Sequence, residues 1–216
     1  MSKITDAEKR QLADIIEKKG FYTIKSTASF NRYIDNVIEG YRNNDLYTYI
    51  CGGKFDENIV REILLSSYSV VENWAIAYAD SPELNACAIW IPSGIVRANL
   101  RNFIKNGGTN LIKYGGPELI LRVIKYVKLI SDMKKDHTRH NDWYLFNYEC
   151  KPEADTEELF INLIKPVVDY AWTTGRSCYA EATLESRISG YLKMGFHFVD
   201  KAKISKTDIT MYSMMV

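Results

Sequence analysis

The segment from Asp142 to Ala171, "DWYLFNYECKPEADTEELFINLIKPVVDYA", changes from a strand pattern to a helix pattern within a few residues. Its first part, up to Cys150, is mostly apolar and aromatic with few charges, which is typical of a central strand. In its second part apolar residues recur with helical spacing for more than three turns. These residues are Leu159, Phe160, Leu163, Ile164, Val167, Val168, Ala171 and Trp172. The segment therefore predicts a central strand that leads into an amphipathic helix from about Thr156 to Thr173.

The chain after this helix continues the same alternation. "SCYAEAT" is a strand, "ESRISGYLKMG" is a short helix that ends in Gly195, and "FHFVDKAKI" with "ITMYSMMV" forms a closing hairpin. From this strand-helix-strand pattern we expect residues 143–150 and 178–183 to be adjacent, roughly parallel strands of one sheet, linked right-handedly by the helix between them.

The first half of the chain mixes helices with antiparallel strands. A capping box of Thr5 and Glu8 predicts a helix from Asp6 to about Lys19. The strand "FYTIKST" follows, then two helices, a helical stripe that begins at Phe30 and "DENIVREILLSSYSVV". The strands "WAIAYAD" and "NACAIWI" form a hairpin, and "GPELILRVIKYVKLISDM" is helical. The fold class is α/β, with a central mixed sheet flanked by helices and a helical insert before the fourth strand.

The length and charge of the chain limit the number of domains and the classes of ligand that we expect. Its 216 residues contain no linker or repeat, so we expect one domain over 21–216, preceded by an N-terminal helical extension over 1–20. The chain has 28 Lys and Arg residues and 27 Asp and Glu residues, so its net charge does not favour binding to nucleic acid. Charge is less even in the insert from Ser93 to His140, where ten basic residues face three acidic ones and favour an anionic ligand.

Targeting and metal signals are weak. No signal peptide is recognised at the start of the chain, and no apolar run is long enough to span a bilayer. The four cysteines form no CxxC pair, which indicates reduced thiols and a cytoplasmic protein. His137 and His140 are three residues apart without a third ligand, so we predict no metal site.

The turn between the central strand and its helix contains four carboxylates and no glycine. They are Glu153, Asp155, Glu157 and Glu158. Strand-to-helix turns often bind phosphate through free backbone N–H groups, and glycine lets the backbone approach the ligand. Here Asp155 and Glu158 predict an Asp-type capping box, which would use those same donors. The residues alone indicate a helix cap.

The order of elements, the opening segment and "CYAEATLESRISGYLKMGFHFV" resemble the GNAT superfamily of acyl-CoA-dependent N-acyltransferases. The branch that it resembles most contains puromycin N-acetyltransferase-like proteins, and "AIWIPSG" is similar to the strand before that branch's helical insert. The resemblance covers about residues 21–216, with the specific motifs in the last third. It implies a GNAT-like fold and transfer of an acyl group, most simply acetyl, from acetyl-CoA or another acyl-CoA to an amine of a small molecule or peptide. The acceptor pocket would then lie between the first two helices of the domain and the basic insert.

The resemblance implies a pyrophosphate-binding loop of the form Q/R-x-x-G-x-G/A at the start of the helix. Its positions fall on Asp155, Thr156, Glu157, Glu158, Leu159 and Phe160. Asp155 stands at the position of the Gln or Arg. Glu158 stands at the position of the first Gly, and Phe160 stands at the position of the second Gly or Ala. The loop is therefore degenerate in sequence.

The resemblance also assigns roles to residues around the loop. Tyr191 in "SGYLKMGF" matches the tyrosine that protonates the departing thiolate of coenzyme A. The strand end at Tyr148, Glu149 and Cys150 matches the edge that pairs with the pantetheine arm and polarises the thioester carbonyl. Arg187 stands where many relatives have an Asn that binds the same arm. It either reaches an anion or is a solvated helix residue, and we favour the second.

The general base is not identified from the sequence. The family's base often matches Tyr144 or Phe146, and neither residue is a base at neutral pH. Glu149 is ionisable, but strict alternation directs it to the opposite face of the strand. The alternative to an enzyme is therefore a retired GNAT-fold binding or interaction protein that no longer binds coenzyme A. The sequence leaves the oligomeric state open, including a homodimer.

Overall fold

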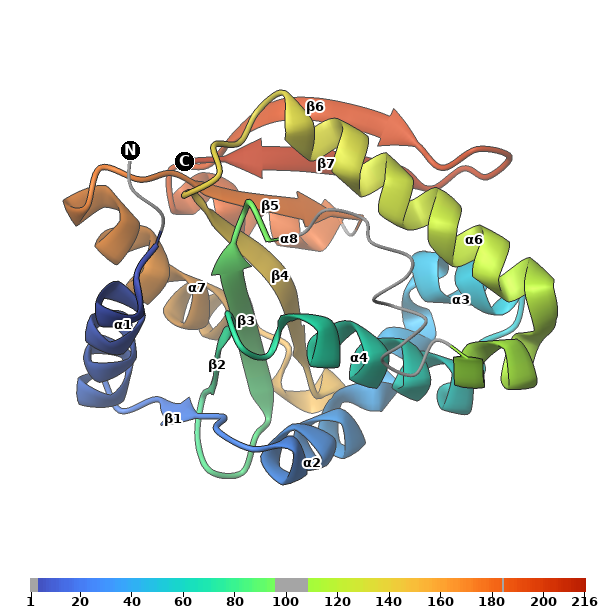
Figure 1. Ribbon diagram of the computed structural model, residues 1–216, viewed down its shortest axis with the longest axis horizontal. Coiled ribbons are helices and arrows are strands. Elements are labelled where there is room, and N and C mark those ends of the chain that lie inside the picture. Colours follow the sequence, from blue (N-terminus) through green and yellow to red (C-terminus); the bar gives the residue numbers. More distant parts are fainter. Residues whose placement is uncertain (1–3, 96–108, 184) are drawn as a thin grey trace.

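The chain is described by a computed structural model over residues 4–95, 109–183 and 185–216. Its centre is a seven-stranded mixed sheet in the order β1-β2-β3-β4-β5-β7-β6 (Figure 1). The strands are β1 (Tyr22–Thr23), β2 (Ile76–Ala79), β3 (Ala86–Pro92), β4 (Trp143–Cys150), β5 (Cys178–Ala182), β6 (His197–Lys203) and β7 (Thr210–Met215). Within the described ranges β4 and β5 pair in parallel, while the other five pairings are antiparallel. The predicted α/β class and the central position of β4 are confirmed.

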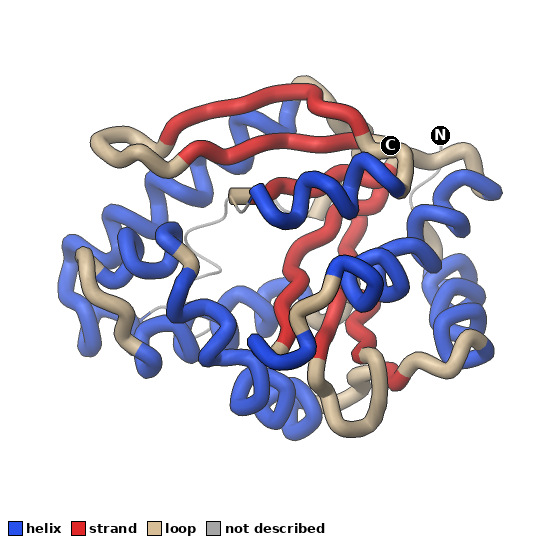
Figure 2. The backbone as a smooth tube through the Cα atoms, turned by 180° about the vertical axis from the view of Figure 1, so that it is seen from behind, coloured by secondary structure: helices blue, strands red, loops and turns tan. Residues whose placement is uncertain are grey.

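Helices cover both faces of this sheet (Figure 2). They are α1 (Asp6–Lys18), α2 (Thr27–Val37), η1 (Ile38–Asn43), α3 (Asp45–Cys51), α4 (Glu57–Val71), α6 (Thr109–Lys135), η3 (Pro152–Ala154), α7 (Glu157–Thr173) and α8 (Glu185–Lys193). Side chains from α1, α7 and α8 pack on one face, and side chains from α2, η1, α4 and α6 pack on the other. The helical insert before the fourth strand is confirmed as α6, although residues 96–108 of the insert lie outside the described residues.

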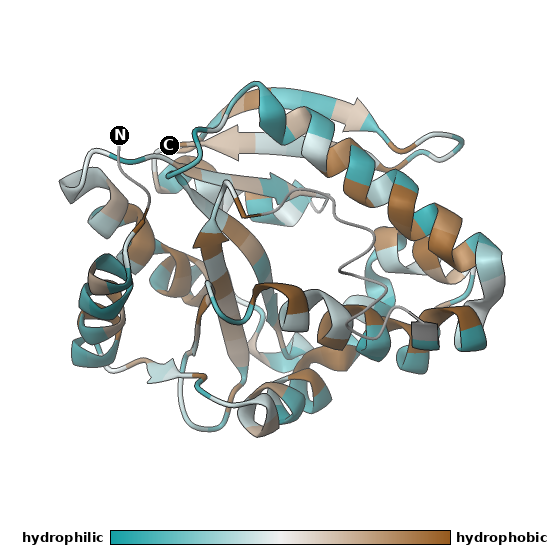
Figure 3. Cartoon of the chain, viewed as in Figure 1, coloured by the Kyte–Doolittle hydropathy of each residue, from teal (hydrophilic) through white to brown (hydrophobic). Residues whose placement is uncertain are grey.

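The core follows from the two-residue period of the strands. In β3, Ala88 and Trp90 contact the layer of α7, whereas Cys87 and Ile89 contact the layer of α2. All four side chains are at most 1% exposed. Figure 3 accordingly shows β3 mostly in hydrophobic colours, in contrast to the hydrophilic outer side of α1. A strand that is apolar on both faces needs a helical layer on each side, and the chain supplies both.

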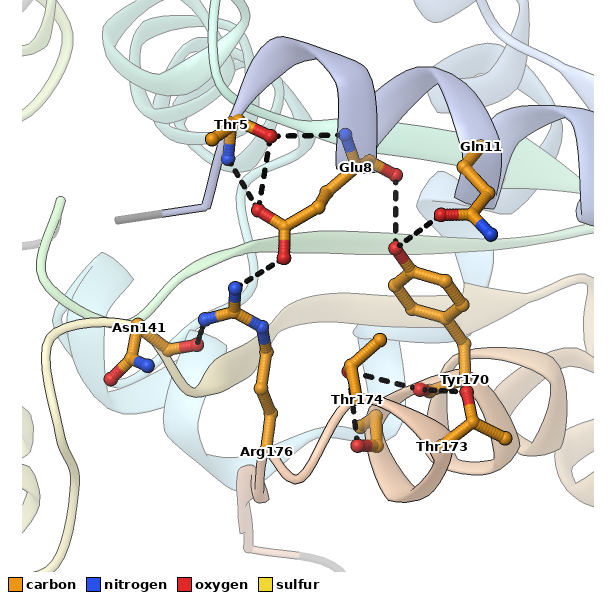
Figure 4. A network of polar contacts seen from close by, with 9 residues as sticks. Thr5, Glu8, Gln11, Asn141, Tyr170, Thr173, Thr174 and Arg176 are labelled. Atoms are coloured by element: carbon orange, nitrogen blue, oxygen red, sulfur yellow. Dashed lines mark hydrogen bonds and ion pairs between the residues drawn. The ribbon is translucent and has the colours of Figure 1, made fainter. Parts of the chain in front are cut away.

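Helix α1 is held to the sheet by a polar network (Figure 4). The predicted capping box is confirmed, because the Thr5 N–H donates to Glu8 and the Glu8 N–H donates to Thr5 Oγ1. Glu8 also forms an ion pair with Arg176, whose Nη1 donates to the Asn141 carbonyl at 2.9 Å. Below this network Leu12 is fully buried in the core beside α7. The network therefore joins α1 to the loops that precede β4 and β5.

Several predicted elements differ in extent. The first strand is only Tyr22–Thr23, because only two residues pair with β2. The predicted helical stripe from Phe30 to Tyr41 is divided between α2 and η1, and α3 is an additional helix that the sequence analysis did not predict. The apolar stripe of α7 ends at Ala171, since Trp172 is 82% exposed.

The predicted cap of α7 is wrong. The N-cap residue is Thr156, whose Oγ1 accepts a hydrogen bond from the Leu159 N–H at 3.1 Å. Asp155 lies one residue outside the helix and forms an ion pair with Arg187 on α8. The expected Asp155–Glu158 capping box does not form, because the N-cap position is one residue later, at Thr156, and the Asp155 carboxylate pairs with Arg187.

Candidate functional site

Strands β4 and β5 start side by side and then diverge, as Figure 1 shows. Their pairing is confirmed, but it covers only Trp143 with Cys178 and Tyr144 with Tyr179. Just beyond, β4 contains a bulge: Asn147 pairs with Ile89 and Leu145 pairs with Trp90, which leaves Phe146 without a partner on β3. The bulge bends β4 away from β5, so the middle of the sheet opens into a slot.

The slot holds a cavity of about 130 Å³ that is lined from both faces of the sheet. Tyr148, Phe160, Arg187 and Tyr191 line it from the α7 and α8 side. From the other side it is lined by Tyr41, Tyr47, Tyr126, Tyr144, Glu149 and Glu181. The cavity is thus lined by side chains from both layers of helices.

Glu149 faces this cavity, contrary to the prediction from alternation. Because the bulge adds one residue to β4, Glu149 lies on the same face as Tyr144 rather than on the opposite one. The residue is 7% exposed, and its Oε1 accepts a hydrogen bond from the Cys150 N–H at 3.1 Å. A side chain on Gly40 would meet the Cys150 carbonyl at 2.6 Å and Glu149 Oε1 at 3.2 Å, so glycine permits this approach. Burial raises the pKa of Glu149 to about 7.

Glu181 on β5 is the second carboxylate of the cavity, and the sequence analysis missed it. The signal was a single acid in the otherwise apolar strand "CYAEA". Burial raises the pKa of Glu181 well above that of an ordinary carboxyl group, while the charge of Lys134 opposes this shift. One oxygen, Oε1, is buried without a hydrogen-bond partner. A buried, under-satisfied carboxylate in a cavity can accept a proton or bind a cation.

Tyr191 lies across the slot from Glu181. It is 3% exposed and packs edge-to-face on Phe160 and Phe196, with ring centroids 4.9 and 5.0 Å away. Burial raises its pKa, and the charge of Glu181 raises it further. The phenol is therefore protonated at neutral pH, which is the state that a proton donor needs.

Arg187 is not a solvated helix residue, so that interpretation is wrong. Its side chain is 12% exposed, its Nη1 lies 2.5 Å from Asp155 Oδ1, and its Nη2 lies 4.0 Å from Glu149 Oε1. The guanidinium group also stacks over the ring of Tyr148 at 4.9 Å from the centroid. Arg187 therefore places a positive charge at the α8 side of the slot.

The turn before α7 is joined to α8 by charges and packing. Glu157 forms an ion pair with Lys193, and a Cβ on Gly190 would meet the Phe160 ring at 2.6 Å. Leu159 is partly buried against the core, whereas Glu158 is exposed. Burial raises the pKa of the Cys150 thiol to about 11, so this residue is not a thiolate at neutral pH. The structure thus brings the predicted loop residues and Tyr191 together around α8.

The described residues meet the requirements of neither a metal site nor a membrane-spanning helix. There, no three or more His, Cys, Asp or Glu side chains gather where they would hold a metal ion. Within the same ranges every helix is too short or too polar to cross a membrane.

No protein-family model matches the chain, and no curated protein matches it. Among solved structures, a Corynebacterium glutamicum protein described as histone acetyltransferase HPA2 and related acetyltransferase is 15% identical, with a TM-score of 0.57 over 90% of this chain and 94% of that one. An N-acetyltransferase from Staphylococcus aureus is 11% identical, with a TM-score of 0.49 over 85% and 96% of the two chains. A mosquito arylalkylamine N-acetyltransferase like 5b is 13% identical, with a TM-score of 0.47 over 98% and 95%. On the first of these similarities, and with its mixed sheet, the chain has the fold of the GNAT acetyltransferases.

Proposed function

We propose that the protein is an acyl-CoA-dependent N-acyltransferase, most simply an N-acetyltransferase of the puromycin N-acetyltransferase-like branch, that acts on an amine of a small molecule or peptide. The observation that carries the proposal is the slot through the sheet. It presents buried carboxylates from one face and a protonated phenol, Tyr191, from the other. Direct transfer between two substrates needs this arrangement, because a base must serve the amine and an acid must serve the leaving group.

In the proposed reaction the amine nitrogen attacks the thioester carbonyl carbon. The C–N bond forms, the backbone of β4 near Tyr148 stabilises the oxyanion, and the C–S bond then breaks. Glu181 takes the proton that the amine loses, and Tyr191 gives its proton to the departing thiolate. Return of a proton from Glu181 to Tyr191 through the cavity restores both groups. The products are an amide and free coenzyme A, and no proton is gained or lost overall.

The cations Arg187 and Lys193 are the groups that would bind the phosphates of coenzyme A. Both lie on α8 beside the start of α7, and both are paired with acids of the degenerate loop, Asp155 and Glu157. Phosphate oxygens are strong acceptors for guanidinium and ammonium groups. Binding would require these phosphates to replace the two carboxylates. We therefore expect weaker affinity than a glycine-rich loop provides.

The same contacts favour a second candidate, a GNAT-fold binding protein that has lost coenzyme A. Its specific support is that Asp155 and Glu157 already occupy the cations, and Phe160 fills the place that a glycine would leave open.

Titration of the protein with acetyl-CoA and with desulpho-CoA, followed by thermal unfolding, separates the two candidates. A ligand at 100 times its Kd should add about 2.7 kcal/mol to the free energy of unfolding. An increase with both compounds, together with release of free thiol when an amine is added, is the expected result. No increase with any acyl-CoA would overturn the enzyme and support the binding protein.

A further inference from the structure

A fully buried serine lies in the last strand of the sheet. Ser213 on β7 has no exposed surface, and its neighbours along the strand are Tyr212 and Met214. Strands β5 and β7 lie side by side (Figure 1), and Ser213 pairs with Glu181 in their ladder. Directly opposite residues of a ladder project from the same face of the sheet. Burying a hydroxyl group costs free energy unless it finds a hydrogen-bond partner, so this serine needs one.

The partner of Ser213 is the phenol of Tyr179. The two oxygens are 2.7 Å apart, and Tyr179 is fully buried as well. Tyr179 precedes Glu181 by two residues on β5, so the two side chains project from the same face of that strand. Tyr179 packs in the layer of α2 and α6. Ser213, Tyr179 and Glu181 therefore form one cluster on this face of the sheet.

Two phenols act on the Glu181 carboxylate as hydrogen-bond donors. Burial is the largest influence on the pKa of Glu181 and raises it. The hydrogen bond from Tyr144, the charge of Lys134 and the hydrogen bond from Tyr179 each lower it. Tyr144 comes from β4 and Tyr179 from β5, so the phenols reach the carboxylate from both strands that border the slot. A hydrogen bond to the ionised form of a carboxyl group stabilises that form.

Other ionisable groups around the cluster interact with it through charge. Tyr126 on α6 and Tyr191 on α8 are each within electrostatic reach of Glu181. Asp200 on β6 is exposed and reaches Tyr179 through its charge. Tyr179 differs from these groups because it also donates a hydrogen bond to the carboxylate.

We propose that Tyr179, anchored by Ser213, is a positioning residue that holds the Glu181 carboxylate at the wall of the slot. A hydroxyl group has one proton to donate and can also accept. If Ser213 donates to the Tyr179 oxygen, the phenol proton is directed to Glu181, and the carboxylate is kept ionised at a lower pH than burial alone would allow. The effect of the cluster on turnover rests on the proposed function, whereas its effect on the ionisation of Glu181 does not.

Carboxyl carbon NMR between pH 5 and pH 10 tests the cluster without any substrate, and Glu181→Gln identifies the signal. Tyr179→Phe should raise the pKa of Glu181 by about one pH unit, because a hydrogen bond to a charged group is lost. Ser213→Ala should raise it by less, because Tyr179 keeps its hydroxyl group and loses only the group that orients it. The double variant should match Tyr179→Phe alone, since Ser213 acts through Tyr179.

Tyr78→Phe is the matched control. Tyr78 is also fully buried, and its hydroxyl group donates to the Leu163 carbonyl in the layer of α7. This variant makes the same chemical change as Tyr179→Phe and should leave the pKa of Glu181 unchanged. Ser213→Thr retains a hydroxyl group, so Glu181 should titrate in it as in the wild-type protein. Thermal unfolding of each variant verifies that it is folded.

Three results would overturn the proposal. The first is an unchanged pKa of Glu181 in folded Tyr179→Phe, and the second is a double variant in which the two single increases add. The third is an unchanged pKa in Ser213→Ala, which decides the matter even if Tyr179→Phe does not fold.

Release of free thiol from acetyl-CoA with 2-phenylethylamine connects the cluster to the reaction. In Tyr179→Phe the rising limb of kcat/KM should move to higher pH together with the pKa of Glu181. We expect kcat/KM to be about tenfold lower than in wild type at pH 6.5 and within about twofold of it at pH 9.5. Damage to the packing alone would lower kcat/KM equally at both pH values, and that result would contradict the role of Tyr179 in turnover.

The two measurements separate failure of the cluster from failure of the proposed function. The expected pKa pattern without thiol release from wild-type protein would support the cluster and contradict the acyltransferase. Thiol release with the pKa of Glu181 unchanged in the variants would support the acyltransferase and overturn the cluster.

Discussion

Glu149 and Glu181 are the residues that folding alone does not explain. A buried carboxylate loses its hydration, and an apolar side chain of similar volume would stabilise the same position more. Both carboxylates nevertheless line the slot between β4 and β5, and burial raises the pKa of each. Groups that destabilise the fold and titrate near neutrality are typical of functional sites.

Glu149→Gln should make the protein more stable at high pH. The folded protein keeps this proton up to a pKa of about 7, whereas the unfolded chain releases it near the ordinary value of 4.5. Wild-type stability therefore falls as the pH rises through this window, and the Gln variant is free of that loss. The gain should be small at pH 4.5 and reach roughly 3 kcal/mol at pH 8. Chemical denaturation at the two pH values measures it, and a gain independent of pH would contradict the prediction.

Glu181→Gln should lower kcat/KM by roughly a hundredfold to ten-thousandfold, because it removes the proposed base. In wild-type protein kcat/KM should increase as the pH rises through the neutral range, where Glu181 loses its proton. The variant should lose this increase. A pH profile of thiol release on both proteins provides the measurement, and an unchanged rising limb would exclude Glu181 as the base.

Tyr191→Phe should slow turnover by roughly tenfold to a thousandfold and leave acyl-CoA affinity nearly unchanged. The ring contacts with Phe160 and Phe196 remain in the variant, so only the proton donor is lost. Steady-state kinetics with calorimetric binding separates the two effects. Phe196→Leu is a control that changes the packing of Tyr191 but keeps its hydroxyl group. Equal turnover of Tyr191→Phe and wild type would remove Tyr191 from the mechanism.

At the scale of elements, the helices and strands that depend on neighbouring residues could be predicted from the sequence, and the features that depend on distant partners could not. The apolar stripe of α7 and the aromatic run of β4 are properties of neighbouring residues, so they could be predicted from the sequence. The bulge at Phe146 and the Asp155–Arg187 ion pair depend on partners 32 or more residues away and leave no local signal. Those two features decide which way Glu149 points and how α7 begins. The missing information therefore concerns the site more than the fold.

Asp155→Asn should raise acyl-CoA affinity severalfold. It frees Arg187 from its nearest carboxylate and removes a negative charge beside the phosphates. The exposed Glu158 lies in the same turn, and Glu158→Gln removes the same charge without disturbing Arg187, so it should raise affinity by less than twofold. Calorimetry at low and at 0.5 M salt compares them. Equal gains in the two variants would mean that general charge, rather than Arg187, controls binding.

At the scale of the whole molecule, α1 packs into the hydrophobic core on one face of the sheet. Leu12 and Ile16 are fully buried beside α7, and the Arg176–Glu8 pair lies above them. From the sequence, residues 1–20 are predicted as an extension to the domain, because their capping box and apolar positions define a helix without reference to the rest of the chain. The polar contacts of Glu8 with Arg176 and Tyr170, by contrast, come from residues more than 150 positions later.

Arg176→Ala should lower the free energy of unfolding by about 2 to 4 kcal/mol. The Arg176 side chain is 7% exposed, and its removal leaves the Glu8 carboxylate and the Asn141 carbonyl with one partner fewer. Lys165→Ala breaks the exposed ion pair with Asp169 and should change stability by less than about 0.5 kcal/mol. Urea denaturation of both variants measures the difference. Similar small losses would mean that α1 is held by its apolar contacts alone.

The short pairing of β4 with β5 has a mechanical consequence. Only two residue pairs join the half-sheet of β1 to β4 to the half-sheet of β5 to β7, although the remaining strands are paired over up to seven residues. The β3–β4 and β6–β7 ladders are longer than the β4–β5 ladder, so fewer backbone hydrogen bonds resist bending at the middle of the sheet than on either side of it. Helix α7 contacts both β3 and β5 and so spans this weaker junction. Small changes in the angle between the two halves would widen or narrow the slot and leave the packing of either half intact.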